Sequence, residues 1–152
     1  MAEMFTIQGL EAVQAKMKAV KDDVKGKAAR QALAKAARIV TNAAKANARR
    51  VDDAHTGRQI ALNISQRFAT KTYRATGDVM YRIGVATPKG KIPKGNPDEG
   101  AKGPTYHWHL IELGTGTVPA SPFMLPALSS NINQVTDKFV IELGLALDKV
   151  TP

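Results

Sequence analysis

Two histidines and a glutamate stand close together in the chain and are its side chains best suited to catalysis or metal binding. On a strand, His107 and His109 would point to the same side as half of a zinc site, but the chain has no cysteine and only one other histidine, His55, in a distant turn. Glu112 could act as a general base, yet no second carboxylate, histidine or nucleophile has a recognisable spacing to it. We therefore expect no metal site and no catalytic site, and we expect Glu112 to hydrogen-bond the backbone of the turn at 114–116.

That turn, Gly114-Thr115-Gly116, is also the nearest approach to a phosphate-binding loop. No Gly-Lys-Thr follows it, and the next residues contain proline rather than a helix start with free N–H groups. We predict no nucleotide and no other cofactor. Trp108, the only tryptophan, is expected in a core or an interface rather than stacked on a nucleic-acid base.

The strongest chemical bias of the chain is positive charge. Its 22 Lys and Arg against 13 Asp and Glu give a net charge of +9, which attracts polyanions or an acidic protein. No acid occurs between Asp23 and Asp52, and four cations of that window fall on one side of a predicted helix: Lys27, Arg38, Lys45 and Arg49. These four are candidate contacts to DNA phosphates or to an acidic partner, and an ordinary solvated helix face is the alternative.

The size and composition of the chain indicate how many domains it forms and which classes of protein it can belong to. With 152 residues, of which 43% are hydrophobic, the chain is long enough for one domain with a core. The lack of cysteine fits assembly in a reducing cytoplasm. No apolar run reaches the roughly 20 residues of a membrane span, and the start lacks a signal-peptide pattern. We expect a single domain, residues 1–152, that is neither secreted nor inserted in a membrane.

Hydrophobic periodicity predicts an α+β fold. A short strand at 5–7 and a helix at about 10–20 precede a long helix from Asp22 or Asp23 to about Arg50, whose small-residue face is Ala29, Leu33, Ala36, Val40, Ala43 and Asn47. Partial alternation at 60–73 and 78–87, with a turn at 75–78 between them, predicts a β-hairpin. We expect this small antiparallel sheet, at about 60–87, to be packed by the long basic helix and by a C-terminal helix.

Three further segments complete the predicted layout. Residues 105–113 form an amphipathic strand or a short helix, and residues 124–149 form the last helix, which buries Leu128, Ile132, Val135, Phe139, Leu143, Ala146 and Val150. Residues 88–104 contain four prolines and four glycines, and predict a long exposed loop that is mobile in the free subunit and orders on assembly. Trypsin should cleave this loop at Lys89, Lys91, Lys94 and Lys102.

Residues 112–128 form the most informative segment. Two glycines and three prolines exclude a continuous helix or central strand, while many of the other side chains are apolar. We predict a rigid, buried corner in which Phe123 is the anchor and Pro126 lies in the first turn of the following helix.

The corner resembles the Glu-x-Gly-Thr … Pro-Ala-x-Pro-Phe-x-x-Pro-Ala-Leu signature of the neck, or tail-completion, family of long-tailed bacteriophages. The positions that carry this resemblance include Glu112, Gly114, Thr115, Pro119, Ala120, Pro122, Phe123, Pro126 and Ala127. Upstream, Thr56-Gly57-Arg58 followed by Ile60, Leu62 and Ile64 is similar to the Thr-Gly-x-Leu-x-x-Ser-Ile stretch of the same family. The chain departs from that stretch at Ile60, where the family usually has Leu or a similar residue, and at Asn63, where it has Ser.

The resemblance implies a structural protein of the virion neck rather than an enzyme. The family's members help join head to tail, which implies a ring between the head-side connector and the tail terminator or tail tube protein, around the path of the genomic DNA. Six-fold symmetry is favoured because long tails are six-fold, and twelve-fold symmetry stays open. The resemblance also implies host cytoplasm as the place of assembly and no membrane partner. The alternative is a free-standing basic nucleic-acid-binding protein, which the positive charge supports.

Overall fold

The computed structural model describes residues 9–18, 20, 22–52, 57–87 and 100–150. The chain divides into two compact units. The first comprises Met1–Ile39, Phe68–Arg82 and Ile132–Pro152, and the second comprises Val40–Arg67 and Ile83–Asn131. The strand predicted at 5–7 lies outside the described residues, and the single domain expected from the chain length stays a prediction.

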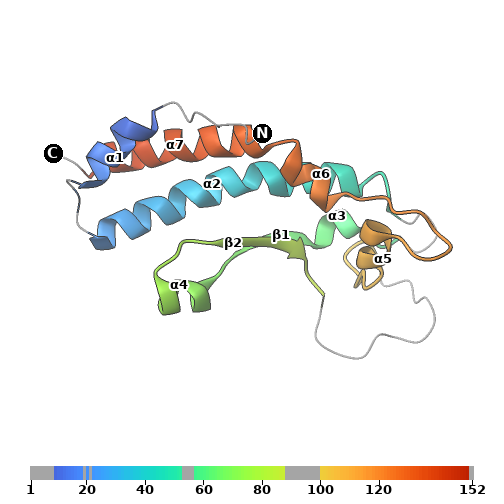
Figure 1. Cartoon of the computed structure of the whole chain (residues 1–152). Coiled ribbons are helices and arrows are strands. Elements are labelled where there is room, and N and C mark those ends of the chain that lie inside the picture. The colour runs from blue at the N-terminus through green and yellow to red at the C-terminus, as the bar shows by residue number, and fades with distance from the viewer. Residues whose placement is uncertain (1–8, 19, 21, 53–56, 88–99, 151–152) are drawn as a thin grey trace. The chain divides into compact units, whose positions relative to one another are not determined.

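A long helix, α2 (Asp22–Ala48), supplies residues to both units (Figure 1). Alanine, the best helix former, dominates its sequence, and Asp22 and Asp23 in the first turn complement the positive end of the helix dipole. The backbone N–H groups of Arg50 and Val51 close the last turn on the carbonyls of Asn47 and Ala48. Both ends lie close to the predicted ones.

The buried face of α2 lies one position away from much of the predicted face. One row of buried side chains repeats every four residues, whereas the prediction mixed spacings of four and three. This row is Ala28, Ala32, Ala36, Val40, Ala44 and Ala48, of which Ala36 and Val40 were predicted, and Ala37 and Thr41 are buried beside it. Steps of four advance about 40° beyond a full turn, so this stripe drifts around the helix. Leu33 is only half-buried. The predicted small-residue character of the packed face is right, but four of its six positions are shifted by one residue.

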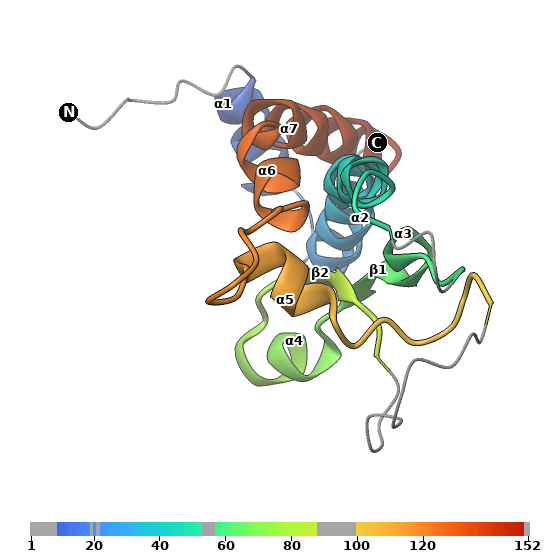
Figure 2. The ribbon, with the colours of Figure 1, turned by 90° about the vertical axis from the view of Figure 1, so that its right-hand side faces the viewer.

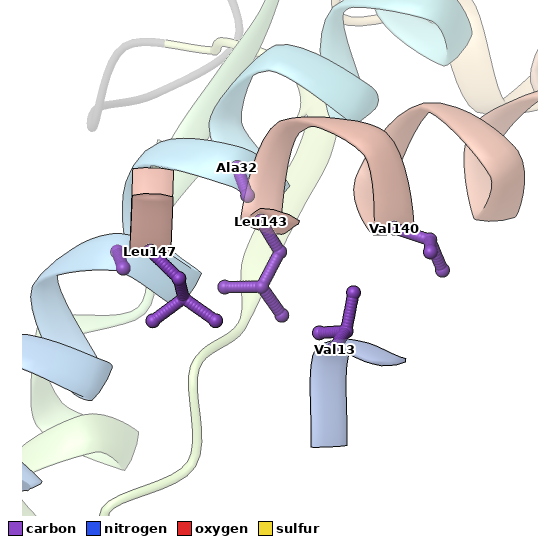
Figure 3. Close-up of a cluster of buried hydrophobic side chains, with 6 residues drawn as sticks. Val13, Ala32, Val140, Leu143 and Leu147 are labelled. Carbon is purple, nitrogen blue, oxygen red and sulfur yellow. The ribbon is translucent and has the colours of Figure 1, made fainter. Parts of the chain in front are cut away.

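The first unit packs α2 and α1 (Leu10–Lys18) against α7 (Ile132–Asp148). Val13 of α1 points toward Val140 and Leu143 of α7 in the cluster drawn in Figure 3. The core of this unit consists of Val13, Ala28, Ala32, Val140, Leu143 and Leu147, with Phe139 and Ala146 partly buried beside it. Leu143 is therefore buried as predicted, whereas Ile132 and Val150 are 46% and 47% exposed and were predicted wrongly.

The two-stranded sheet pairs β1 (Ile64–Phe68) with β2 (Tyr81–Val85). Backbone N–H groups of Ala69 and Ala86 donate to the carbonyls of Met80 and Asn63, which gives an antiparallel register with Phe68 opposite Tyr81. The rings of these two residues lie 5.4 Å apart, and the Arg30 guanidinium stacks 4.0 Å over Phe68. The predicted α+β class and antiparallel pair are confirmed.

Both strands are shorter than predicted, and short helices occupy the two ends of the first one. Residues 60–63 form α3 (Ile60–Asn63), and α4 (Thr70–Thr76) replaces the end of the first predicted strand. Gly77 ends α4 in the left-handed conformation, with φ 79°, and its N–H donates to the carbonyl of Tyr73. The predicted turn at 75–78 is thus a helix C-cap rather than a hairpin turn.

The second unit contains α5 (Trp108–Leu113) and α6 (Met124–Ser129), joined by the corner (Figure 2). For residues 105–113 the sequence predicted either a strand or a short helix, and the structure has the short helix α5. The predicted last helix is broken, since α6 ends at Ser129 and α7 begins at Ile132. Within the described residues, no helix has the length and apolar character needed to cross a membrane.

Candidate assembly surface

The corner is built around one carboxylate. Glu112, near the end of α5, accepts hydrogen bonds from the backbone N–H groups of Phe123, Met124 and Leu125 at 2.7, 3.0 and 2.9 Å. These are donors that the first turn of a helix leaves without internal partners, and a negative charge there complements the helix dipole. Glu112 therefore bonds to the backbone, as predicted, but it caps α6 and not the turn at 114–116.

Phe123 is the anchor of the corner. Its side chain is 0% exposed, which confirms the prediction. The Asn47 side-chain amide of α2 donates to the Phe123 carbonyl at 3.2 Å, so the same residue is held through its N–H and its C=O. The corner is tied to both α5 and α2.

Thr115 closes the tight turn of the corner. Its N–H donates to the Val118 carbonyl at 2.8 Å, and its hydroxyl oxygen accepts from the Val118 N–H at 3.0 Å. Gly114 precedes this turn with φ 75°, and a Cβ there would lie 2.7 Å from the Ala120 nitrogen. Only glycine fits this position without displacing the backbone.

Most of the corner, in contrast to the prediction, lies on the surface. Thr115, Pro119, Ala120 and Pro122 are exposed, Pro126 is half-buried, and only Phe123 and Ala127 are buried. The exposed apolar side chains are Leu113, Val118, Leu125 and Leu128, at 77%, 58%, 67% and 50%, and Leu110 of α5 at 46%. Apolar composition alone does not distinguish a core from a binding surface. We call these five residues the corner surface.

A cavity of about 490 Å³ opens beside the corner surface. Leu110, Ile111, Val118 and Pro119 supply its apolar lining, and Arg50 is the charged residue among those that line it. The hollow is open and largely apolar, so it offers apolar surface that a side chain of a partner protein could cover.

A second cluster of the same unit joins the Thr-Gly-Arg stretch to the end of the predicted loop. The Arg58 guanidinium donates to the Pro104 carbonyl at 3.0 Å, and the Asn63 amide donates to the Gly103 carbonyl and the Thr105 hydroxyl at 2.9 and 3.1 Å. Arg58 and Thr105 are 7% and 0% exposed. Asn63, a departure from the family pattern, thus has a structural role that a single sequence did not reveal.

The remaining predicted site residues are the loop lysines and the two neighbouring histidines. Lys102 is exposed in a turn that the Gly103 N–H closes on Gly100, while Lys89, Lys91 and Lys94 lie outside the described residues. Because α5 is a helix, residues two apart such as His107 and His109 do not face one another. In the part of the chain that the structure describes, no three potential metal ligands cluster.

The four candidate basic residues lie on the surface, three of them in α2 and Arg49 directly after its end. Lys27, Arg38 and Arg49 are exposed and Lys45 is half-buried. None of the four makes an ion pair with a carboxylate of the described residues; the lysines that do are Lys16, Lys25, Lys35 and Lys138.

The sequence of this chain matches the profile of one protein family over residues 11–114, about two thirds of its length. The family is described as "Bacteriophage HK97-gp10, putative tail-component". The chain belongs to this family. The match includes α2, the sheet and the Arg58 cluster but ends at Gly114, so most of the corner signature lies beyond it. No curated protein and no solved structure matches the chain.

The family description is that of a phage tail component, which is consistent with a structural protein located in the virion. It confirms the resemblance stated from the sequence at the level of a phage neck or tail protein.

Proposed function

We propose that the protein is a neck, or tail-completion, subunit that forms a ring between the head-side connector and the tail terminator or tail tube protein, and that it is not an enzyme. The observation that carries the proposal is the corner surface. Large apolar side chains are exposed on a segment whose backbone Glu112, Asn47 and Thr115 hold in place. Several large exposed apolar side chains on one rigid segment are a feature of protein interfaces.

A fixed surface of this kind suits ring formation. In a closed ring each subunit offers one surface to the next, and pre-organised contacts lose less conformational entropy on binding. We propose six copies around the DNA path, with twelve as the alternative, and the nine signature positions of the corner as the structural basis of the contact. We further propose that the loop segment with Lys89, Lys91 and Lys94 orders on assembly; Lys102 already lies in a formed turn.

The test is to replace Leu113, Val118 and Leu125 with serine. All three side chains are exposed, so the subunit should stay folded and soluble. Phage that depend on this variant should accumulate unjoined heads and tails. Leu62→Ser is the matched control, because Leu62 of the same unit is 46% exposed but belongs to α3. Normal neck assembly by the triple variant would refute the proposal.

The ring itself is tested by imaging. Electron microscopy of particles that carry a tag on this subunit should show density at the head–tail junction with six or twelve copies. Label found only along the tail tube, or only at the distal tip, would place the protein elsewhere in the tail and contradict the neck assignment.

A second candidate, a free-standing DNA-binding protein, is favoured by the acid-free stretch of α2. Lys27, Arg38 and Lys45 lie within about 20° of one another around the helix, because 3.6 residues make a turn, and Arg49 follows directly after the helix end. In the ring proposal the same residues meet DNA or an acidic neighbouring ring.

Changing all four to glutamine separates these alternatives. The folded variant should impair head–tail joining or DNA retention if the residues act within the neck. The free-standing protein would be favoured by a different pair of results. The isolated parent subunit would bind DNA tightly and in a salt-dependent way, and the variant would lose this binding while head–tail joining stays normal.

A further inference from the structure

A second hollow lies in the first unit, between α2 and α7, which run beside each other there (Figure 1). Its volume is about 330 Å³. The residues that line it are Val24, Lys27, Ala28, Gln31, Ala32 and Lys35 of α2, and Glu142, Leu145, Ala146, Lys149 and Val150 of α7 and its C-terminal end. We call this hollow the α2–α7 groove.

The α2–α7 groove combines an apolar lining with an apolar rim. Ala28 and Ala32 are 5% and 1% exposed, and their small side chains leave room above them. Leu145 and Val150 line the same groove but are 53% and 47% exposed. A partner side chain that entered the groove would remove apolar surface from water on both helices.

The charges around the groove are mostly positive. Lys27, Lys35 and Lys149 line it, and Glu142 is the one acid among the lining residues. That carboxylate already binds the ammonium groups of Lys138, at 2.7 Å, and of Lys35. These hydrogen bonds lower the pKa of Glu142 to about 2, so it stays ionised and paired. Lys27 and Lys149 have no such carboxylate among the described residues, and the groove carries excess positive charge.

We propose that the α2–α7 groove binds an acidic, amphipathic segment of a neighbouring virion protein, with an apolar side chain in the hollow and carboxylates against Lys27 and Lys149. Charge complementarity selects the carboxylates, and the apolar lining selects a protein over DNA, whose outer surface offers phosphate but no apolar side chain. The corner surface of a second copy does not match, because its five residues are all apolar and the neighbouring carboxylate, Glu112, is used within the corner.

This inference goes beyond the proposed ring and does not depend on it. The groove belongs to the first unit, whereas the corner surface belongs to the second. It rests on membership of a tail-component family, which implies neighbouring virion proteins.

A photo-crosslinker at position 145 tests the occupant in assembled particles. With p-benzoylphenylalanine in place of Leu145, irradiation should join this chain to a peptide of a different virion protein, with Asp or Glu next to the crosslinked residue. The same crosslinker at Met80, also exposed in the first unit, should not capture that peptide. Capture of DNA, capture of a second copy of this chain, or no capture at position 145 would overturn the proposal.

Binding of a defined peptide tests separately whether the groove prefers acidic and apolar side chains. The purified subunit should bind a fluorescent helical peptide of Glu, Leu and Ala more tightly than versions with Ser for Leu or Lys for Glu. Lys27→Gln and Lys149→Gln should each weaken binding by up to about five-fold, the size of an exposed ion pair. Lys71→Gln, on the exposed surface of α4, is the matched control.

The outcomes are distinguishable from those of the ring proposal. Equal binding of the Ser-for-Leu peptide, or equal binding of the Lys-for-Glu peptide, would show that the groove does not select an acidic amphipathic segment. Leu145→Ser leaves the corner surface unchanged, so ring formation should persist in this variant while probe binding falls. Unchanged probe binding by Leu145→Ser would also overturn the inference.

Discussion

Removing the Glu112 carboxylate should break the hydrogen bonds between α5 and the start of α6 and lower the free energy of unfolding. In Glu112→Ala three backbone N–H groups lose their acceptor. Those of Phe123 and Met124 are part-buried, whereas that of Leu125 is exposed and can bond to water. An unsatisfied buried donor costs about 1–3 kcal/mol, so the two part-buried groups predict a loss of about 3 kcal/mol.

Glu112→Gln should fall between the parent and Glu112→Ala. Its side-chain oxygen can still accept from Phe123 and Met124, but its NH₂ group would face the Leu125 N–H, and the charge that complements the helix dipole is lost. We expect a cost of about 1–2 kcal/mol.

Urea unfolding of the purified subunit measures both variants. Trp108 is the only tryptophan and belongs to the second unit, so its fluorescence follows the unit that contains the cap, while far-ultraviolet circular dichroism follows the helices of the whole chain. Asp137→Asn, on the exposed surface of α7 and away from its first turn, is the control and should stay within about 0.5 kcal/mol of the parent. If Glu112→Ala also unfolded within about 0.5 kcal/mol of the parent, the capping argument would be wrong.

Three further changes test the packing, the turn and the charges. Phe123→Ala should lose about 3–5 kcal/mol in the same assay, because the ring is fully buried, and a loss under about 1 kcal/mol would contradict its role as anchor. Gly114→Ala should be destabilised by more than about 1 kcal/mol through its positive φ and the Ala120 contact, whereas Gly116→Ala, with open space around it, should be nearly neutral; equal effects would refute the argument. The folded pKa of Glu142, about 2, lies below its ordinary 4.5, so its contribution is complete above about pH 4.5 and is lost as the pH falls toward 2. Urea midpoints of the parent and of Glu142→Gln should therefore differ near neutral pH and converge at acidic pH, and a difference that does not change with pH would count against the ion pairs with Lys138 and Lys35.

Local chemistry allowed much of the fold to be predicted. The length and ends of α2 follow from alanine content and acidic residues at its start, which act within a few residues of chain. The strand pair follows from alternation, and the start of α6 from proline in its first turn. The break between α6 and α7, and α4 inside the predicted hairpin, were missed. Gly77 was a signal for the end of α4, because glycine often ends helices in the left-handed conformation.

The sequence alone determined the helix-rich α+β class, the position of the corner, Phe123 as its anchor and the resemblance to phage neck proteins. Only the tertiary structure decided which N–H groups Glu112 caps and which apolar residues of the corner stay exposed. Both depend on contacts between residues that are distant in sequence or in different elements, such as Asn47 with Phe123. The physical reason is that local propensity fixes backbone conformation, whereas burial and pairing are decided by what packs against a segment, so Leu125 on the surface and Phe123 in the core look equally apolar in the sequence.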